Sequence, residues 1–263
     1  MEKIPEQEAI QNNLSNSRFQ NKKTRVGVDF EYLNELEKYF GHKNESTIEK
    51  LQNFPKYVPT KNMISFLSKN EIFKKILNVH GAVVECGVLF GGGLMSWANF
   101  SAIYEPINLT RKIIGFDTFE GFPGRHEKDS VGDFGAKGDF ASNSYEDLQQ
   151  CVDIFDMLRY KNHVPKVELV KGNFLETSKK YLEDNPHLAI ALLFLDFDIY
   201  EPTKAALDLF MDRVPKGGII AFDHLFYKGT AGETVAFAES VGLSKYKVER
   251  FYWDPLISYI VKE

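Results

Sequence analysis

The chain has 263 residues, of which 43% are hydrophobic and 26% charged, a composition that excludes wholesale disorder and suits one large domain or one domain with an appendage. Its formal net charge is −5, whereas duplex-binding proteins are usually basic, so we expect no nucleic-acid partner. The two cysteines, Cys86 and Cys151, make no disulfide framework and favour a reducing, cytoplasmic setting. The polar N-terminus lacks a signal-peptide core, and no apolar run approaches the ~18 residues that cross a bilayer, so no membrane association is expected.

The N-terminal third differs from the rest of the chain. Residues 1–25 are rich in Asn, Gln, Lys and Glu and lack apolar periodicity, which predicts a flexible arm. Residues 26–80 predict a helical region with one amphipathic helix over 28–40 and a second over 61–78, capped by Thr60. In the first of these helices the apolar side chains recur at helical spacing: Phe30, Leu33, Leu36 and Phe40.

Residues 81–263 alternate short apolar strands with helices. The expected strands are Ala82–Cys86, Lys112–Phe116, Val167–Val170, Ala189–Asp196, Gly218–Asp223, Tyr246–Tyr252 and Ile257–Val261. The expected helices are Gly92–Ile103, Tyr145–Arg159, Phe174–Asn185, Glu201–Arg213 and Gly232–Val241. This alternation predicts an α/β fold with a doubly wound, seven-stranded, mostly parallel sheet. The short link around Pro255 joins the last two strands as a hairpin, which makes the last strand antiparallel.

A glycine-rich turn follows the first expected strand. Gly87 and Gly91–Gly93 lie between that strand and a helix, where backbone N–H groups can contact a nucleotide cofactor. A tight turn without a ligand is the alternative. The spacing departs from the dinucleotide fingerprint, since Leu89 stands between the glycines, and Glu85 occupies a position that is normally apolar. A carboxylate there favours a cofactor that carries an ammonium group over one that carries a pyrophosphate.

Carboxylates end three of the other expected strands. Asp117 lies 30 residues after Gly87 and is a candidate for hydrogen bonds to both ribose hydroxyls, with a helix N-cap as the alternative. Asp196 and Asp223 end two strands whose tips lie roughly 5 Å apart if the strands are neighbours. With His224 as a third donor, this pair suits a hard divalent ion such as Mg²⁺. A packed or solvated His224 that makes no metal bond is the alternative.

Five stretches together resemble one known family. They are Val83–Gly92, Gly115–Pro123, Lys171–Thr177, Leu195–Thr203 and Pro215–His224, and they span about residues 80–225. In this order they resemble the class I S-adenosylmethionine-dependent methyltransferases, and most of all the macrocin O-methyltransferase family, which methylates sugar hydroxyls. The resemblance implies a Rossmann-like fold and a divalent metal at Asp196 and Asp223, with His224 where the family usually has Asp.

The resemblance and the residues together give the expected site. The expected cofactor contacts are Glu85, Cys86, Gly87, Gly91, Gly92, Asp117, Thr118, Gly172, Asn173, Phe174 and Asp196. Of these, the segment 172–174 is expected to border the adenine. The expected metal ligands are Asp196, Asp223 and His224, and the expected catalytic residues are Asp196, Asp198 and His224.

These assignments predict transfer of a methyl group from S-adenosylmethionine to a sugar hydroxyl of a natural product or a nucleotide-linked sugar. Mg²⁺ or another divalent ion would assist, a sugar or diol would be the acceptor, and the enzyme would act as a cytoplasmic homo-oligomer. An NAD-dependent Rossmann oxidoreductase, a non-catalytic binding protein and a β-lactam hydroxylase-like relative are the alternatives.

The segment 124–143 is polar, glycine-rich and without periodicity. It follows the strand that ends at Asp117, so we expect a mobile lid at the active edge, with a surface insertion as the alternative. Its basic side chains are candidates to bind an anionic acceptor, and its aromatic side chains are candidates to stack on a ring. These candidates are Arg125, His126, Lys128, Phe134 and Phe140.

Overall fold

The computed structural model describes residues 27–41, 45–130 and 135–263 of the chain. It divides into two units, Met1–Met63 and Ile64–Glu263, and the division falls within helix α4 (Thr60–Lys75). The expected arm 1–25 lies outside the described residues.

The first unit is helical where it is described. It contains α2 (Gly27–Phe40), α3 (Thr47–Gln52), the 3₁₀ turn η1 (Phe54–Lys56) and the first residues of α4. Helix α3 was not predicted, because it is short and buries none of its side chains. A capping box begins it: Ser46 accepts a hydrogen bond from the Glu49 amide, and the Glu49 carboxylate accepts one from the Ser46 amide. Thr60 is the first residue of α4, not the cap that precedes it.

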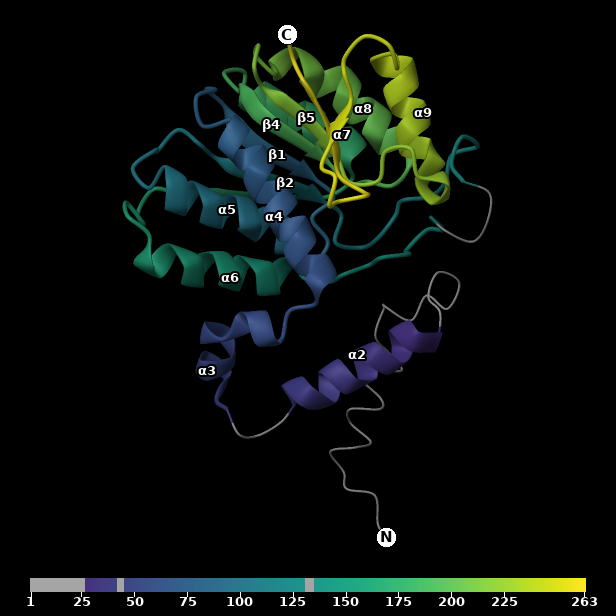
Figure 1. The fold of residues 1–263 in the computed structure, drawn as a ribbon. Coiled ribbons are helices and arrows are strands. Elements are labelled where there is room, and N and C mark those ends of the chain that lie inside the picture. Colours follow the sequence, from purple (N-terminus) through teal and green to yellow (C-terminus); the bar gives the residue numbers. More distant parts are fainter. Residues whose placement is uncertain (1–26, 42–44, 131–134) are drawn as a thin grey trace. The chain divides into compact units, whose positions relative to one another are not determined.

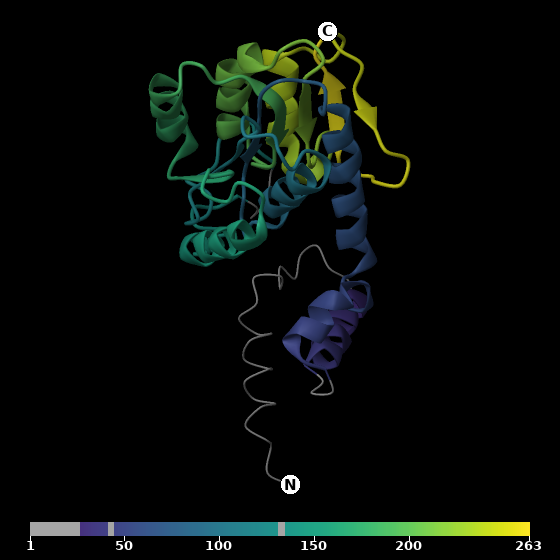
Figure 2. The ribbon, with the colours of Figure 1, turned by 90° about the vertical axis from the view of Figure 1, so that its left-hand side faces the viewer.

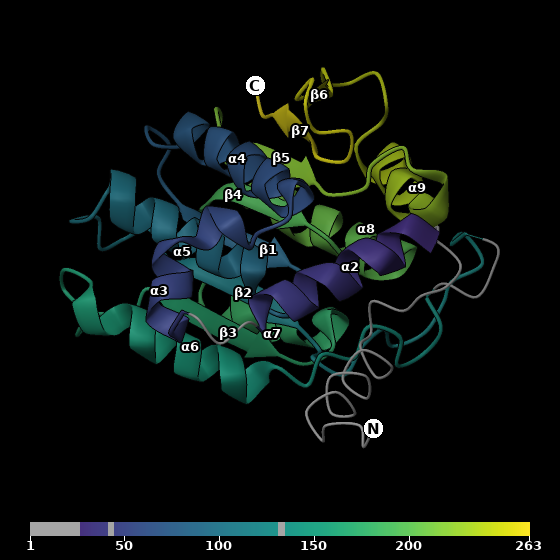
Figure 3. The same cartoon turned by 60° about the horizontal axis from the view of Figure 1, so that its bottom comes forward.

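The second unit is built on one seven-stranded sheet. Its strands are β1 (Ala82–Cys86), β2 (Ile113–Asp117), β3 (Val167–Lys171), β4 (Ile190–Leu195), β5 (Ile219–Phe222), β6 (Glu249–Arg250) and β7 (Ser258–Val261). They lie in the order β3-β2-β1-β4-β5-β7-β6. Strands β1 to β5 are parallel, and β7 runs antiparallel to both of its neighbours, β5 and β6. The predicted doubly wound sheet with an antiparallel last strand is therefore confirmed (Figure 3).

Helices cover both faces of the sheet (Figures 1 and 2). They are α5 (Gly92–Tyr104), α6 (Tyr145–Leu158), α7 (Phe174–Asp184), α8 (Tyr200–Phe210) and α9 (Ala231–Ser240), with the short turns η2 (Met211–Arg213) and η3 (Lys228–Thr230). One apolar core, around Trp97 and Phe194, joins α4, α5 and α6 to the sheet. The other, around Phe116 and Phe210, joins α7, α8 and α9 to the opposite face. Among the described helices, none combines the length and apolar character that a bilayer span requires.

The register of the parallel strands aligns their carboxyl ends. Cys86 pairs with Phe116 and with Leu195, and Leu195 pairs with Phe222. Each of these residues is the last apolar position before a glycine or an aspartate. The sheet therefore brings the four residues that follow to one edge, where open α/β sheets bind ligands: Gly87, Asp117, Asp196 and Asp223.

Candidate active site

The glycine turn after β1 packs tightly against the end of β4. Gly87 has φ 93°, and a Cβ atom there would lie 2.1 Å from the carbonyl oxygen of Asp196. Only glycine tolerates both the conformation and the contact. Leu89 also has a positive φ, 53°, and Gly91 caps the N-terminus of α5 in the left-handed conformation. The turn is a strained, close-packed structure at a helix N-terminus.

Asp117 holds this turn in place. Its Oδ2 atom accepts hydrogen bonds from the Val88 and Leu89 amides at 2.7 and 2.8 Å, and its Oδ1 atom accepts one from the Phe119 amide at 2.6 Å. A carboxylate oxygen has about two lone-pair sites, so Oδ1 keeps one of them for a ligand. Asp117 therefore stabilises the turn in addition to the ribose contact expected of it. Its remaining acceptor site can accept a hydrogen bond from one ribose hydroxyl, not from both.

Glu85 lies beneath the glycine turn and is 2% exposed. Its Oε1 atom would be 2.0 Å from a Cβ atom on Gly93, and its Oε2 atom is buried without a hydrogen bond. Burial raises the pKa of Glu85 to about 8, although the nearby Lys69 ammonium opposes the shift. A positive charge placed nearby would therefore stabilise the ionised form of Glu85.

A cavity of about 260 Å³ lies along this edge of the sheet. One side is lined by the turn and by the ends of β2 and β3, with the residues Gly87, Leu89, Asp117, Thr118, Gly172, Asn173 and Phe174. The other side is lined by the ends of β4 and β5 and the start of α8, with the residues Asp196, Phe197, Asp198, Ile199, Pro202, Asp223 and His224. Gly121, Phe122, Pro123 and Phe140 line the rest. Most of the expected cofactor and metal residues thus share one cavity.

The other expected cofactor residues do not line the cavity. Gly91 and Gly92 begin α5, and Glu85 lies under the turn. Cys86 belongs to the apolar core on the opposite face of the sheet, where burial raises the pKa of its thiol. The alternation of side chains along β1 explains this placement, since neighbouring residues of a strand face opposite ways.

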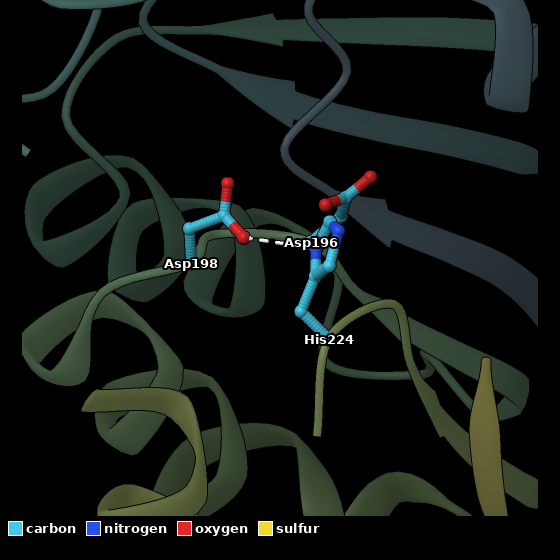
Figure 4. Close-up of side chains that lie close together, drawn as sticks. All are labelled: Asp196, Asp198 and His224. Atoms are coloured by element: carbon cyan, nitrogen blue, oxygen red, sulfur yellow. Dashed lines mark ion pairs between the residues drawn. The ribbon is translucent and has the colours of Figure 1, made fainter. Parts of the chain in front are cut away.

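Three side chains form a compact cluster at the ends of β4 and β5 (Figure 4). Asp196, Asp198 and His224 each offer one ligand atom, and these atoms lie within 4.8 Å of one another. His224 Nδ1 lies 3.0 Å from Asp198 Oδ1 and 3.2 Å from Asp223 Oδ2. The sequence-based set of Asp196, Asp223 and His224 therefore needs an addition: Asp198, expected only as a catalytic residue, joins the cluster, and Asp223 contacts it through His224.

The left-handed backbone of Asp198 explains why it joins the cluster. Its φ is 62°, which is uncommon for a residue other than glycine. If the chain stayed extended after β4, the Asp198 side chain would point to the same side as that of Asp196 but lie two residues further from the end of the strand. The turn of the chain at Asp198 brings its carboxylate back toward His224, as Figure 4 shows.

The charged groups of the cluster shift one another's pKa values. Burial raises the pKa of Asp196 well above its ordinary value, and the neighbouring charges of Asp223 and Asp198 raise it further. Burial lowers the pKa of His224, but the contact with Asp198 and the charges of Asp223 and Asp196 outweigh burial and raise it to about 10. An excess of carboxylates over cations therefore marks this end of the cavity.

The first part of the expected lid is bound to α8 and α9. Asp129 Oδ1 accepts a hydrogen bond from the Tyr200 amide at 2.7 Å, which caps the first turn of α8. Lys128 Nζ donates to Glu239 at 2.7 Å and lies 4.5 Å from the centre of the Tyr200 ring. The His126 ring lies 4.6 Å from the same ring. His126 and Lys128, expected to bind an anionic acceptor, are thus engaged within the protein, and Phe134 lies outside the described residues.

Comparisons with known proteins agree with this geometry. Residues 67–246 match the family model described as Macrocin-O-methyltransferase (TylF). The chain belongs to this family. It is accordingly an S-adenosylmethionine-dependent O-methyltransferase, and the NAD-dependent alternative is not favoured. No curated protein matches the chain.

Solved structures of other methyltransferases also resemble this chain. The chain is similar to CalS11, calicheamicin methyltransferase, with 33% identity over 90% of this chain and 93% of that one and a TM-score of 0.87. An apo structure of CalS11, described as TDP-rhamnose 3'-O-methyltransferase, matches with 31% identity over 90% and 95% of the two chains and a TM-score of 0.78. The O-methyltransferase NovP shares the fold at 20% identity, over 76% and 79% of the chains, with a TM-score of 0.60.

Sequence reasoning missed several residues of the methyltransferase cavity. Phe122, Pro123, Ile199 and Pro202 line it without having been singled out. Each lies within a few residues of an expected site residue, inside the stretches Gly115–Pro123 and Leu195–Thr203 that carry the family resemblance. Their position within these stretches is the sequence feature that could have identified them as cavity residues.

Proposed function

We propose that the protein transfers the methyl group of S-adenosylmethionine to a hydroxyl group of a sugar. We propose that this reaction requires a divalent cation, preferably Mg²⁺. The observation that carries the proposal is the shared cavity, which is lined both by the glycine turn and Asp117 and by Asp196, Asp198 and His224 of the cluster. A methyl donor held by the turn and a hydroxyl held by the cluster would therefore meet in one cavity.

The described residues fit S-adenosylmethionine in three respects. The cavity offers aromatic side chains, Phe122, Phe140 and Phe174, beside the ends of β2 and β3, which suits an adenine ring. Asp117 Oδ1 retains one acceptor site for a ribose hydroxyl. The buried, hydrogen-bond-free Oε2 of Glu85 suits a nearby positive charge, which the cofactor carries on its ammonium and sulfonium groups.

The cluster fits a divalent cation by its donor set. Two carboxylates and an imidazole converge, with a third carboxylate, Asp223, in contact with His224. Asp198 Oδ1 and His224 Nδ1 are buried and lie 3.0 Å apart. A donor set with more oxygen than nitrogen and no sulfur favours Mg²⁺ or Mn²⁺ over zinc. We therefore propose Asp196, Asp198 and His224 as the residues that hold the cation, with Asp223 beside them.

The chemistry we propose is an in-line displacement at the methyl carbon. S-adenosylmethionine supplies a methyl group that is already reactive on its sulfonium, and a divalent cation, when bound, would lower the proton affinity of the acceptor hydroxyl. The protein then has to align the hydroxyl and receive its proton. Asp196 and Asp198 are the candidates to receive it, because both carboxylates line the cavity at the ends of the cluster strands.

A sugar attached to a nucleotide is the acceptor that we favour. CalS11, with which the chain shares about a third of its residues, is described as a TDP-rhamnose 3'-O-methyltransferase. A sugar ring offers neighbouring hydroxyls, and such a pair suits an oxygen-rich cation site. The segment 124–143 is proposed as the lid over this acceptor. The homo-oligomer and the cytoplasmic location stay predictions.

The test is a methyl-transfer assay with TDP-rhamnose, S-adenosylmethionine and Mg²⁺, followed by mass spectrometry. We expect one added methyl group on the sugar, loss of turnover with EDTA, and a large loss in the Asp198→Asn variant. Asp184→Asn is the matched control, because its carboxylate is exposed and pairs with Lys180 along α7. An enzyme that binds S-adenosylmethionine but methylates no sugar hydroxyl in this assay would contradict the proposal.

A further inference from the structure

The hydroxyl of Ser144 bonds to the glycine turn instead of to its own helix. Ser144 is the N-cap residue of α6, where a serine side chain commonly accepts a hydrogen bond from the helix backbone, but its side chain makes no such bond. Its hydroxyl donates to the Leu89 carbonyl at 2.5 Å, although the two residues are 55 positions apart in the chain. Ser144 is buried, so little water is available to replace this bond. The Ser144 hydroxyl therefore stabilises the glycine turn and not α6.

A second buried serine supports this hydrogen bond. The hydroxyl oxygens of Ser142 and Ser144 lie 2.8 Å apart, and Ser142 is also buried. A hydroxyl group has one hydrogen and two acceptor sites, so Ser144 can accept a hydrogen bond from Ser142 while it donates to Leu89. Ser142 therefore favours the orientation in which the Ser144 hydroxyl points its hydrogen at the turn.

Leu89 is the residue whose backbone conformation depends on this bond. Its φ of 53° is uncommon outside glycine, and such a conformation persists where surrounding contacts fix it. Two contacts do so: the Leu89 amide donates to Asp117 Oδ2 at 2.8 Å, and the Leu89 carbonyl accepts from Ser144. Asp117 and Ser144 thus hold the peptide groups on either side of the Leu89 Cα atom. Because Leu89 lines the cavity, the Ser144 hydroxyl helps to fix the cavity wall.

The start of α6 contacts the cofactor side of the cavity at two further points. The Asn143 amide donates to the carbonyl of Phe119, two residues after the end of β2, at 2.9 Å. Leu148, one helical turn after Ser144, packs against Gly91, where a Cβ atom would lie 2.3 Å from Leu148 Cδ1. The start of α6 therefore packs directly on the glycine turn, and Ser144 supplies the hydrogen bond of that contact.

We propose that Ser144 is a positioning residue for the cofactor, whose hydroxyl holds Leu89 in its left-handed conformation and so preorganises the glycine turn for S-adenosylmethionine. The inference rests on the proposed placement of the cofactor at this turn. A turn that already has its binding conformation loses less conformational entropy when the ligand binds, and the affinity is higher for that reason. Without the hydroxyl, the Leu89 carbonyl loses this donor and the turn relaxes toward the conformations that leucine ordinarily adopts.

A purely structural Ser144 would behave differently. Loss of its hydroxyl would then lower the melting temperature, but the folded protein would bind the cofactor as the wild type does. Ser101 offers the matched comparison, because it is also a buried serine and its hydroxyl donates to Glu105, just beyond the C-terminal end of α5. Since the glycine turn lies at the other end of α5, Ser101→Ala removes a buried hydroxyl without touching the turn.

The experiment is a calorimetric titration of the purified full chain with S-adenosylhomocysteine, well below the melting temperature. We expect Ser144→Ala to weaken binding about three- to tenfold, as for the loss of one hydrogen bond between uncharged groups. Ser144→Thr, which keeps the hydroxyl, should recover most of the affinity, and Ser101→Ala should bind as the wild type does. Hydrogen exchange of the cofactor-free proteins gives a second readout: the amides of residues 88–93 should exchange faster in Ser144→Ala than in the wild type and in Ser101→Ala.

The outcomes separate the inference from the proposed function. If the wild type does not bind S-adenosylhomocysteine, the placement of the cofactor is wrong and the inference falls with it. If the wild type binds it and Ser144→Ala binds it equally well, only the inference is overturned. Equal weakening in Ser144→Ala and Ser101→Ala, or in Ser144→Ala and Ser144→Thr, would also overturn it, because the effect would not then be specific to the hydroxyl.

A second variant serves if Ser144→Ala does not fold. Ser144→Cys keeps a side chain of similar size but replaces the hydroxyl with a thiol, which is a weak donor. Weakened binding of S-adenosylhomocysteine by Ser144→Cys supports the inference, and the affinity of the wild type in this variant contradicts it.

Discussion

The carboxylate of Glu85 lies directly under Gly93, so that a Cβ atom on Gly93 would be 2.0 Å from Glu85 Oε1. No side chain fits in that distance, and the contact is to the carboxylate that the cofactor's positive charge would approach. Glycine at position 93 therefore allows the Glu85 carboxylate to pack directly against the first turn of α5.

Gly93→Ala should lower both the stability and the cofactor affinity of the enzyme. The added methyl group must displace Glu85 or the start of α5, and overpacking of this kind costs about 1–3 kcal/mol. Gly92→Ala is the control, because a Cβ atom there meets nothing within 4 Å. Thermal melting and calorimetry with S-adenosylmethionine measure both effects. Equal behaviour of the two variants would show that the close approach is unimportant.

The stability of the cofactor-free enzyme should fall as the pH rises from about 4.5 to about 8, in part because of Glu85. The folded-state pKa of Glu85, about 8, exceeds its ordinary value of 4.5, so the folded state holds the proton more tightly than the unfolded state does. The resulting stabilisation is fully present below pH 4.5 and is lost as the pH passes 8. Glu85→Gln should remove this loss. Melting curves of both proteins at pH 5 and pH 9 test this, and a constant difference between them would count against a raised pKa.

Asp117→Ala should weaken cofactor binding about ten- to a hundredfold and also lower the melting temperature. The sequence alone predicted the first effect with an intact fold. The structure adds the second, because the three amides of Val88, Leu89 and Phe119 lose their acceptor. Hydrogen bonds to a charged acceptor contribute roughly 1.5–3 kcal/mol each. A variant with the melting temperature and the affinity of the wild type would refute both roles.

The strands were predictable to within a residue or two where they are central. Strand β1 matches its expected bounds, and β4 and β5 are one residue shorter at each end than expected, since a buried strand is an apolar run that ends at a polar residue. The edge strand β6 was expected to span Tyr246–Tyr252 but covers only Glu249–Arg250. It pairs only with β7, and apolar pattern does not reveal how far an edge strand remains paired.

The site was predictable where it follows from strand ends and not where it depends on backbone turns. Asp196 and Asp223 could be placed at one edge because parallel strands end together. The contact of Asp198 with His224 could not, because it needs a left-handed residue at Asp198.

The cap that Asp129 provides to α8 should matter more for catalysis than the ion pair beside it. Asp129→Ala leaves the Tyr200 amide without its acceptor and loosens the start of α8, which directly follows Asp198 and Ile199. Loss of an N-cap costs about 0.5–2 kcal/mol, and turnover should fall more than cofactor affinity.

Glu239→Gln is the comparison, since it weakens the exposed ion pair with Lys128 and the hydrogen bond from the Tyr200 hydroxyl but leaves the Asp129 cap in place. Hydrogen exchange of residues 125–130, with and without cofactor and TDP-rhamnose, measures the same segment directly. We expect faster exchange in Asp129→Ala and slower exchange in the wild type once the acceptor is bound. Exchange that is the same in all these states would remove the lid proposal.

The most direct test of the central claim is a single turnover assay with S-adenosylmethionine that carries an isotopically labelled methyl group. The purified enzyme is mixed with TDP-rhamnose and Mg²⁺, and the sugar is examined by mass spectrometry and NMR. The account predicts one labelled methyl group on a ring hydroxyl, no transfer with EDTA, and recovery when Mg²⁺ is restored. Undiminished transfer after chelation would contradict the cation site, and an enzyme that binds the cofactor but transfers the label to no sugar hydroxyl would contradict the proposed function.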